Sequence, residues 1–257
     1  MPNAATNPGS FPEALKKLDA AVIAPRHVRR YRAVAFHAYV LIASGVFVAL
    51  AIIAHTVAYF PIDLTITRAI QSYHGVAFDR LMYAVSWLGF FPQVVPIGLL
   101  VILGVSLAGL RWEAVSLAFA AGSSLFGGLI KLVVVRPRPS ANLVHVLNQL
   151  HSSSFPSGHV LVFTSFCGFL VFLGYTLLKP SGIRSTLLIV LGCILAFMGP
   201  SRIYLGQHWF SDVMGAYLFG TLWLALTIRF YRWGKVRFFV HQPVAPAAPE
   251  NSDVATA

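Results

Sequence analysis

Charged residues are scarce in this sequence. Only 11% of the 257 residues are Asp, Glu, Lys or Arg, whereas 57% are apolar, and the mean hydropathy is +0.74. The core of a water-soluble domain of this size does not need so many apolar side chains. The apolar residues also occur in long uncharged runs rather than at helix or strand period, which excludes a soluble fold and predicts a membrane protein.

Cysteine is also rare. The chain has two, Cys167 and Cys193, and each lies inside an apolar run. A lone thiol in such a run usually behaves as a small hydrophobic side chain. We therefore expect neither a disulfide nor a metal site at these positions, and we expect no cofactor.

Six apolar runs fit a set of transmembrane helices. About 20 apolar residues cross the hydrocarbon core of a bilayer, and shorter runs can be extended by their polar ends. Pro92 and Pro96 should bend the second helix. The sequence predicts an all-α, polytopic membrane protein with a six-helix bundle, whose spans cover residues 33–59, 81–110, 114–130, 160–178, 185–199 and 209–228.

The flanking regions are predicted to be less regular. We expect residues 1–32 to form a cytoplasmic, partly disordered segment. The pattern at 11–23 fits a helix lying on the inner leaflet, and an ordinary solvated helix is the alternative. Residues 33–231 form the six-helix domain, and residues 232–257 form a basic, then Pro/Ala-rich, disordered cytoplasmic tail. Between the first two spans, Asp63 is predicted to be the N-cap of a short amphipathic helix.

Basic residues are unequally distributed between the two sides of this layout. The chain has 19 Lys and Arg against 8 Asp and Glu, a net charge of +11, and 13 of the basic residues lie on the side of the termini. Cytoplasmic loops carry the excess of Lys and Arg, so this side is predicted to be cytoplasmic, and the charge reflects orientation rather than binding to nucleic acid. The outer side holds the other six, which are Arg68, Arg80, Lys131, Arg136, Arg138 and Arg202.

Three clusters of polar residues lie where the predicted spans meet the outer surface. Each has an ordinary explanation by itself: a basic interface anchor, the first turn of a helix, or a polar pair one helical turn apart. Arg202 is harder to explain, because it follows 17 uncharged residues and needs an anion. The clusters are Lys131-x6-Arg138-Pro139, Pro156-Ser157-Gly158-His159 and Ser201-Arg202-x5-His208-x3-Asp212.

A phosphate group would account for the three clusters together. Phosphoryl transfer needs positive charge around three equatorial oxygens and in-line placement of the attacking and leaving groups. Lys131, Arg138 and Arg202 would supply the positive charge. Ser157 and Gly158 would add backbone N–H groups and a hydroxyl at the start of a helix, where an anion is favoured.

Two histidines fit the chemical roles in such a site. His208 has Asp212 four residues later, a carboxylate that can orient the imidazole and stabilise its charged form, so His208 is the candidate nucleophile. His159 follows the phosphate donors and is the candidate acid that protonates the leaving alkoxide. We predict no metal site beside them.

The three clusters resemble the signature of the type 2 phosphatidic acid phosphatase superfamily, with the same residues at the same spacing and in the same order. The resemblance covers roughly residues 63–231 and includes the six-span layout. It implies metal-independent removal of phosphate from a lipid of the inner membrane through a phosphohistidine on His208, at the outer membrane surface. Arg136 lies outside the signature, and we expect it to make a secondary contact with the substrate or a lipid headgroup.

The resemblance leaves the lipid and some rival functions open. Relatives handle polyprenyl diphosphate, phosphatidylglycerol phosphate, phosphatidic acid and lipid A phosphate. A lipid phosphotransferase and a non-enzymatic carrier of an anionic lipid are alternatives. A two-metal phosphatase fits less well because the outer carboxylates Asp63, Asp79 and Asp212 are far apart in the sequence. A serine protease would leave the three cations unexplained, and a soluble haloperoxidase would not need six spans.

Overall fold

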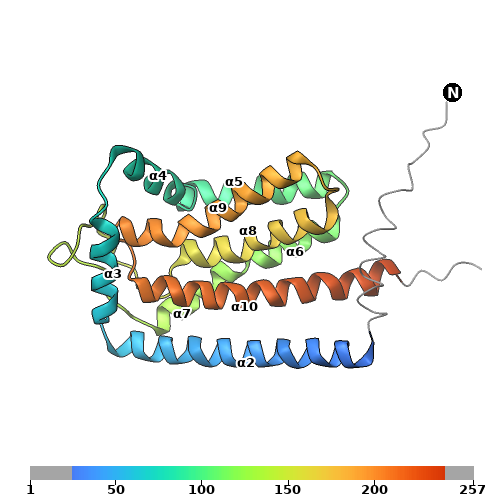
Figure 1. Ribbon diagram of the computed structural model, residues 1–257, viewed down its shortest axis with the longest axis horizontal. Helices are drawn as coiled ribbons and strands as arrows, with labels where there is room; N and C mark the ends of the chain where they lie inside the picture. Colours follow the sequence, from blue (N-terminus) through green and yellow to red (C-terminus); the bar gives the residue numbers. More distant parts are fainter. Residues whose placement is uncertain (1–24, 241–257) are drawn as a thin grey trace, which may run out of the picture.

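Every regular element of the structure is helical within residues 25–240, the part of the chain that the computed structural model describes (Figure 1). This confirms the predicted all-α class, while the predicted helix at 11–23 and residues 241–257 of the predicted tail lie outside the described residues. Residues 232–240, which the sequence predicts to belong to the disordered tail, are helical. The elements are α2 (Arg26–Thr56), α3 (Pro61–Gln71), α4 (Val76–Trp87), α5 (Phe91–Leu107), α6 (Arg111–Ala121), α7 (Ser123–Val133), α8 (Gly158–Leu177), α9 (Gly182–Tyr204), α10 (Phe210–Lys235) and the π-helical turn η1 (Val236–Val240).

The membrane-crossing segments agree with the predicted layout. Five segments of the described chain are long and apolar enough to span a bilayer, and α6 with α7 counts as one of them. The pair α4 and α5 gives a sixth span if the two bent helices are taken together. A polytopic helical bundle is therefore confirmed.

The second span is broken rather than gently bent. α4 and α5 meet at an angle of 60°, whereas the sequence predicts one helix over residues 81–110. Phe90, the N-cap of α5, has an extended backbone with ψ 144°, and Pro92 lies in the first turn that follows. Proline is tolerated in a first turn, where its missing N–H has no helical acceptor, so the helix restarts here. Pro96 lies inside α5 without ending it.

The last two spans are longer than the sequence predicts. α9 continues through Pro200 to Tyr204, past the expected end at residue 199, because one proline near a helix end removes only one hydrogen bond. α10 continues to Lys235, past the expected end at residue 228. There the Lys235 ammonium lies 2.6 Å from the buried carboxylate of Glu113 in α6, which ties this end of α10 to its neighbour.

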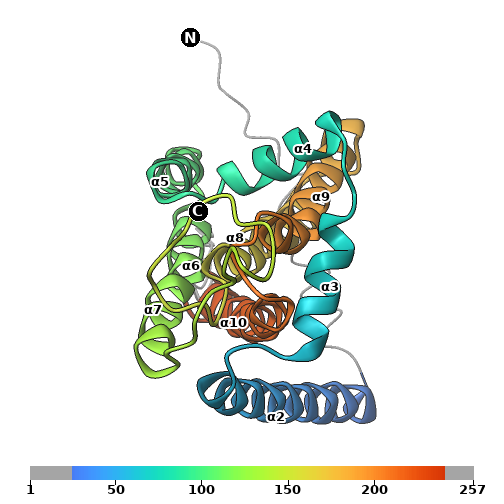
Figure 2. The same cartoon turned by 90° about the vertical axis from the view of Figure 1, so that its left-hand side faces the viewer.

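α8 forms the centre of the bundle. Figure 2 looks along the helices and shows α8 surrounded by α6, α9 and α10, all of which pack against it. In the most apolar part of α8, 56% of the residues are buried inside the protein, against 11% for the peripheral α2. Close packing depends on Gly220 in α10, where a Cβ would lie 2.7 Å from the Cβ of Thr164 in α8.

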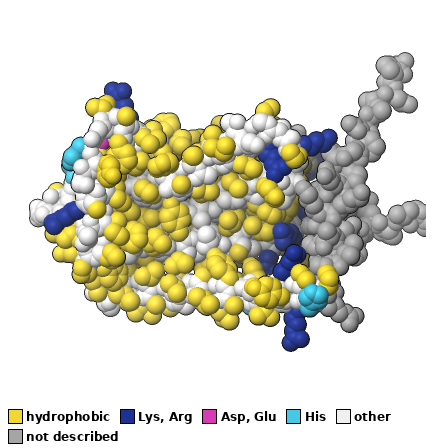
Figure 3. Space-filling view, in the orientation of Figure 1, with side chains coloured by type: hydrophobic (Ala, Val, Ile, Leu, Met, Phe, Trp, Pro, Cys, Tyr) yellow, Lys and Arg dark blue, Asp and Glu magenta, His cyan; other side chains and the backbone are white. Residues whose placement is uncertain are grey.

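The two ends of the bundle differ. α2 begins and α10 ends at one end, which we call the terminal end; α3 and the loop at 134–157 lie at the other, which we call the α3 end (Figure 1). Figure 3 shows an apolar band between the two ends, with Lys and Arg side chains gathered mainly near the terminal end. Such a band with basic residues at its border is the surface expected of a protein that spans a bilayer.

Candidate active site

The three sequence clusters meet at the α3 end. The chain leaves and re-enters the bundle there after α7 and again after α9, so residues from distant segments become neighbours (Figure 1). Lys131 lies in the last turn of α7, Arg138 in the next loop, Ser157, Gly158 and His159 at the start of α8, Arg202 in the last turn of α9, His208 between α9 and α10, and Asp212 in the first turn of α10.

His208 is buried, with a different partner at each ring nitrogen. Its Nε2 lies 3.3 Å from Nη1 of Arg138. A guanidinium can only donate, so this contact assigns Nε2 as the acceptor and puts the ring proton of the neutral form on Nδ1. Nδ1 lies 3.7 Å from Oδ2 of Asp212 and 3.5 Å from Oγ of Ser154. The lone pair of Nε2 therefore points to the side where the cations lie.

The surroundings of His208 keep its imidazole neutral. Removal from water is the largest cause that lowers the pKa of His208 well below its ordinary value of 6.5, and the charges of Arg138, Lys131 and Arg202 lower it further. A neutral imidazole is the form that can act as a nucleophile or a base. Burial also lowers the pKa of Arg138 from its ordinary value of 12.5, an effect that Asp212 opposes.

The three cations of the signature have neutral hydrogen-bond acceptors. In the described part of the chain, no carboxylate lies within ion-pair distance of any of them. Their positive charge is therefore not neutralised by direct contact, as a site for an anion requires. Their closest acceptors are the Ser153 carbonyl for Lys131 (2.6 Å), the Gln207 carbonyl for Arg138 (2.6 Å) and the Ser86 hydroxyl for Arg202.

Several buried polar atoms at this site have no hydrogen-bond partner. They are Oγ of Ser157, Nε2 of His159 and Nε of Arg202, three of the six such side-chain atoms in residues 25–240. Buried polar groups in native proteins are nearly always paired, so unpaired ones need an explanation. All three belong to the sequence clusters, and a bound anion would pair them.

The start of α8 differs in one respect from the prediction. The N–H of Ser157 donates to the backbone carbonyl of Asp212 (3.2 Å), so it is not available to a phosphate. The hydroxyl of Ser157 does not cap the helix and is one of the unpaired atoms. Gly158, the first residue of α8, has open space where a side chain would be. The hydroxyl and the helix start remain as the donors at this point.

Arg136 has a different place from the one predicted. The expected contact with substrate or a headgroup is not what the structure shows, because the side chain is buried between two carboxylates. Its Nη2 lies 2.9 Å from Oδ2 of Asp63, and its Nη1 lies 2.6 Å from Oδ1 of Asp212. The two carboxylates are thus close in space although far apart in sequence. Asp79 is separate and accepts a hydrogen bond from the hydroxyl of Tyr204.

Asp63 occupies the first turn of α3 rather than its N-cap. Phe60 is the N-cap, and its N–H donates to Oδ2 of Asp63 (3.0 Å). Within residues 25–240, no group of three or more His, Cys, Asp or Glu side chains is arranged as the ligands of a metal ion would be. The carboxylates at the α3 end contact Arg136 instead.

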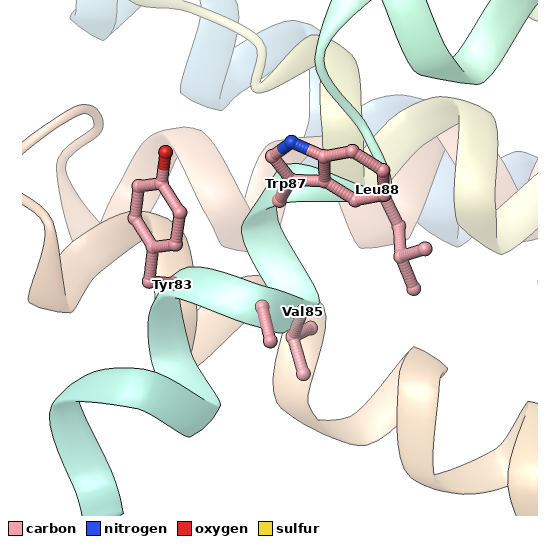
Figure 4. Close-up of a pocket in the computed structure, with 5 residues that line it drawn as sticks. Tyr83, Val85, Trp87 and Leu88 are labelled. Carbon is pink, nitrogen blue, oxygen red and sulfur yellow. The ribbon is translucent and has the colours of Figure 1, made fainter.

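The break between α4 and α5 forms another wall of the site. A Cβ on Gly89 would lie 2.2 Å from Cδ2 of His159, so only glycine fits there. The ring of Phe90 packs edge to face on His159 at 5.7 Å, and the guanidinium of Arg202 lies 5.8 Å from the same ring. An open apolar cleft of about 520 Å³ borders the break on α4, and Figure 4 shows the side chains of Tyr83, Val85, Trp87 and Leu88 that line it.

Five residues of the site are not predicted from the sequence. Ser154 and Gln207 adjoin the second and third clusters, and this proximity was the signal that could have found them. Ser86, Gly89 and Phe90 lie within a long apolar run and have no such signal. Only the fold places them beside Arg202 and His159.

Comparison with known proteins supports a phosphatase. Residues 113–235 match the family model described as the PAP2 superfamily. Phosphatidylglycerophosphatase B of Bacillus subtilis (strain 168) is 31% identical over 184 residues, which are 68% of this chain and 86% of that protein.

Two crystal structures have a similar fold. One is a transmembrane PAP2-type phosphatidylglycerolphosphate phosphatase from Bacillus subtilis. It superposes with a TM-score of 0.66 at 26% identity, over 78% of this chain and 98% of that one. Aquifex aeolicus LpxE has a TM-score of 0.54 at 21% identity, over 67% of this chain and 98% of its own. The second likeness concerns the fold alone.

A helical membrane bundle with clustered cations and two histidines at one end defines a class of integral-membrane phosphatase. The chain belongs to the PAP2 superfamily, among its membrane lipid phosphatases. The family predicted from the three sequence clusters is therefore confirmed.

We expect Gly89→Ala to impair the enzyme, because the added methyl group would displace the His159 ring, 2.2 Å away. Such overpacking typically costs about 1–3 kcal/mol, and displacement of His159, the candidate acid, should lower kcat about 10-fold or more. The measurement is kcat on a lipid phosphate together with the thermal midpoint. Gly98→Ala, in a helical position of α5 with nothing within 4 Å, is the matched control. Equal kcat in the two variants would show that His159 is not displaced.

Proposed function

We propose that this protein hydrolyses the phosphate monoester of a lipid of the phosphatidylglycerol phosphate type, without a metal ion and through a phosphohistidine on His208. The 31% identical relative is named a phosphatidylglycerophosphatase, and one relative of known structure is a phosphatidylglycerolphosphate phosphatase. These names support the substrate class. The polyprenyl diphosphate, phosphatidic acid and lipid A phosphate considered from the sequence are the competing substrates.

The observation that most supports phosphate binding is the set of unpaired atoms at Ser157, His159 and Arg202. Each unpaired buried group costs about 1–3 kcal/mol. Phosphate oxygens would accept hydrogen bonds from the serine hydroxyl and the guanidinium, and the imidazole would face the ester oxygen. A fold that leaves these donors open in one place is adapted to a tetrahedral anion.

The charge of the site supports a monoester. Four basic side chains and two carboxylates are buried or half-buried at the α3 end, which leaves two positive charges. A phosphate monoester carries about −1.5 to −2 charges at pH 7 and would balance them. The residues counted are Lys131, Arg136, Arg138 and Arg202 against Asp63 and Asp212.

In the first step, Nε2 of His208 attacks the phosphorus, and an N–P bond forms while the bond from phosphorus to the lipid oxygen breaks. His159 gives its proton to the departing lipid oxygen. The His208 ring becomes positively charged, and Asp212, whose Oδ2 lies 3.7 Å from Nδ1, stabilises this charge. Lys131, Arg138 and Arg202 surround the transferred phosphoryl oxygens.

In the second step, water attacks the phosphorus and the N–P bond breaks. His159, now neutral, takes a proton from the water, and inorganic phosphate leaves as His208 returns to its neutral form. A second lipid hydroxyl in place of water would make the enzyme a phosphotransferase. The apolar cleft beside the break between α4 and α5 supports a lipid as the phosphate carrier, since it lies next to Gly89 and Phe90.

We expect purified protein in detergent to release inorganic phosphate from phosphatidylglycerol phosphate in the presence of EDTA. The reason is that the positive charge comes from side chains of the protein. The assay compares kcat/KM for this lipid, phosphatidic acid, undecaprenyl diphosphate and a lipid A phosphate, with His208→Ala as the blank. Turnover lost in EDTA and restored by a divalent cation would contradict the metal-free mechanism. Lipid binding without phosphate release would indicate a carrier.

The two histidines should respond differently to replacement by alanine. His208→Ala should abolish both the trapped phosphoenzyme and turnover, because it removes the proposed attacking nitrogen. His159→Ala should lose about 10²- to 10⁴-fold in rate on a lipid substrate, the usual contribution of a general acid, and less on p-nitrophenyl phosphate, whose leaving group needs little protonation. Rapid-quench trapping of acid-labile phosphoprotein measures both. A phosphoenzyme in His208→Ala but not in His159→Ala would reverse the roles.

We also propose that the α3 end faces the outside of the bacterial inner membrane and that both termini are cytoplasmic. Basic residues are concentrated near the terminal end, and cytoplasmic loops carry such an excess. The substrate would then be drawn from the outer leaflet.

A thiol-labelling experiment tests this orientation. In a background without Cys167 and Cys193, Ala141→Cys at the α3 end should react with an impermeant maleimide in intact cells. Gly182→Cys, an exposed position in the first turn of α9 at the terminal end, should react only after the cells are opened. The reverse pattern would place the site on the cytoplasmic side.

A further inference from the structure

Asp63 and Arg136 lie behind the site, and neither is a signature residue of the three sequence clusters, although Arg136 lies within the segment of the first cluster. Asp63 comes from α3 and is 0% exposed, and Arg136 comes from the loop after α7 and is 1% exposed. Arg136 joins Asp63 and Asp212 in one buried ion triad, with N–O distances of 2.9 and 2.6 Å. The triad draws its members from three separate segments of the chain.

Asp212 depends on contacts other than His208 for its position. Its Oδ1 accepts a hydrogen bond from Arg136 (2.6 Å). Its Oδ2 accepts one from the N–H of Trp209 (2.8 Å) and one from the hydroxyl of Ser154. The distance to Nδ1 of His208, 3.7 Å, is the longest of the four. The carboxylate is therefore held from behind and presented to the histidine.

Asp63 also fixes the backbone next to Asp212. Its Oδ1 accepts the N–H of Ser211 at 2.7 Å, and its Oδ2 accepts the hydroxyl of Ser211 at 2.8 Å. Nη1 of Arg136 donates to the same hydroxyl at 2.8 Å. These bonds tie the first turn of α10 to α3, so both members of the pair act on the residue that precedes Asp212.

The charge of the triad fits a role during the reaction. Two carboxylates and one guanidinium carry one net negative charge behind His208. The His208 ring gains one positive charge when its Nε2 bonds to phosphorus. Without Arg136, the two buried carboxylates would lose the ion-pair partner that they share, and a buried charge without a partner is strongly destabilising.

We propose that Asp63 and Arg136 are positioning residues, which hold the carboxylate of Asp212 aligned behind His208 while the phosphoryl group is transferred. This inference rests on the function proposed above. It concerns the rate of the chemical step rather than phosphate binding, because neither side chain reaches the cations and unpaired atoms that would hold the phosphate.

Asp63→Asn tests the inference with little change of shape. The amide retains an oxygen for the N–H of Ser211 but removes the negative charge from the triad. We expect kcat to fall about 10- to 100-fold, the usual effect of removing an outer partner of a functional histidine. KM and the inhibition constant of orthovanadate, which resembles the transferred phosphoryl group, should stay close to those of the wild type.

Two substitutions of Arg136 give a second measurement. Lysine keeps the charge but is a single point donor, so it cannot bridge both carboxylates as the planar guanidinium does. We expect Arg136→Lys to retain a higher kcat than Arg136→Gln, with vanadate inhibition preserved in both. If the role were purely structural, the substitutions would lower the amount of folded protein but would not lower kcat at an unchanged KM.

Glu113→Gln is the matched control, because it changes a buried carboxylate, 1% exposed, that pairs with Lys235 at the terminal end. It should lower the thermal midpoint and leave kcat per folded molecule unchanged. Wild-type kcat in Asp63→Asn, or a raised KM with unchanged kcat, would overturn the inference. If Asp63→Asn is not recovered folded, Arg136→Lys is judged by the same criterion. A wild-type protein that releases no phosphate would instead refute the proposed function.

Discussion

The constraint on which this structure depends is the burial of positive charge at one end of an apolar bundle. A cation removed from water loses several kcal/mol of solvation and needs compensation nearby. Here Lys131, Arg138 and Arg202 are compensated by carbonyl and hydroxyl oxygens that lie at helix ends and in the loops between them. The irregular backbone at the α3 end therefore solvates the cations, and it does so without cancelling their charge.

The sequence predicts the signature part of this end well for a physical reason. Lys131, Ser157, Arg202 and Asp212 each lie at a helix end, so a motif beside an apolar run indicates that its residues lie at one end of the bundle. The supporting part is less predictable. Asp63 and Arg136 meet only because α3 packs across the start of α10, and that contact has no local pattern in the sequence.

The sequence predicts which segments are helical better than it predicts where each helix begins and ends. Hydropathy detects where an apolar run stops, but α9 continues past Gly199 because its last turn is buried against protein, and that turn includes Arg202. Over residues 81–110 the sequence predicts one helix where the structure has two, because a uniformly apolar run gives no sign of the break between α4 and α5. The end of α9 and the break between α4 and α5 both lie at the site, where the neighbours of the helix are polar side chains rather than lipid.

The break between α4 and α5 brings a polar surface and an apolar surface close together. Irregular backbone is tolerated near a membrane where protein rather than lipid covers it, and here His159 packs against Gly89 while Ser86 accepts from Arg202. The lining of the neighbouring cleft is apolar, and it consists of residues from the same turn. The two helices meet at 60° here, so the residues of the break do not belong to one continuous helix. The same irregularity thus suits a molecule whose phosphate is polar and whose chains are not.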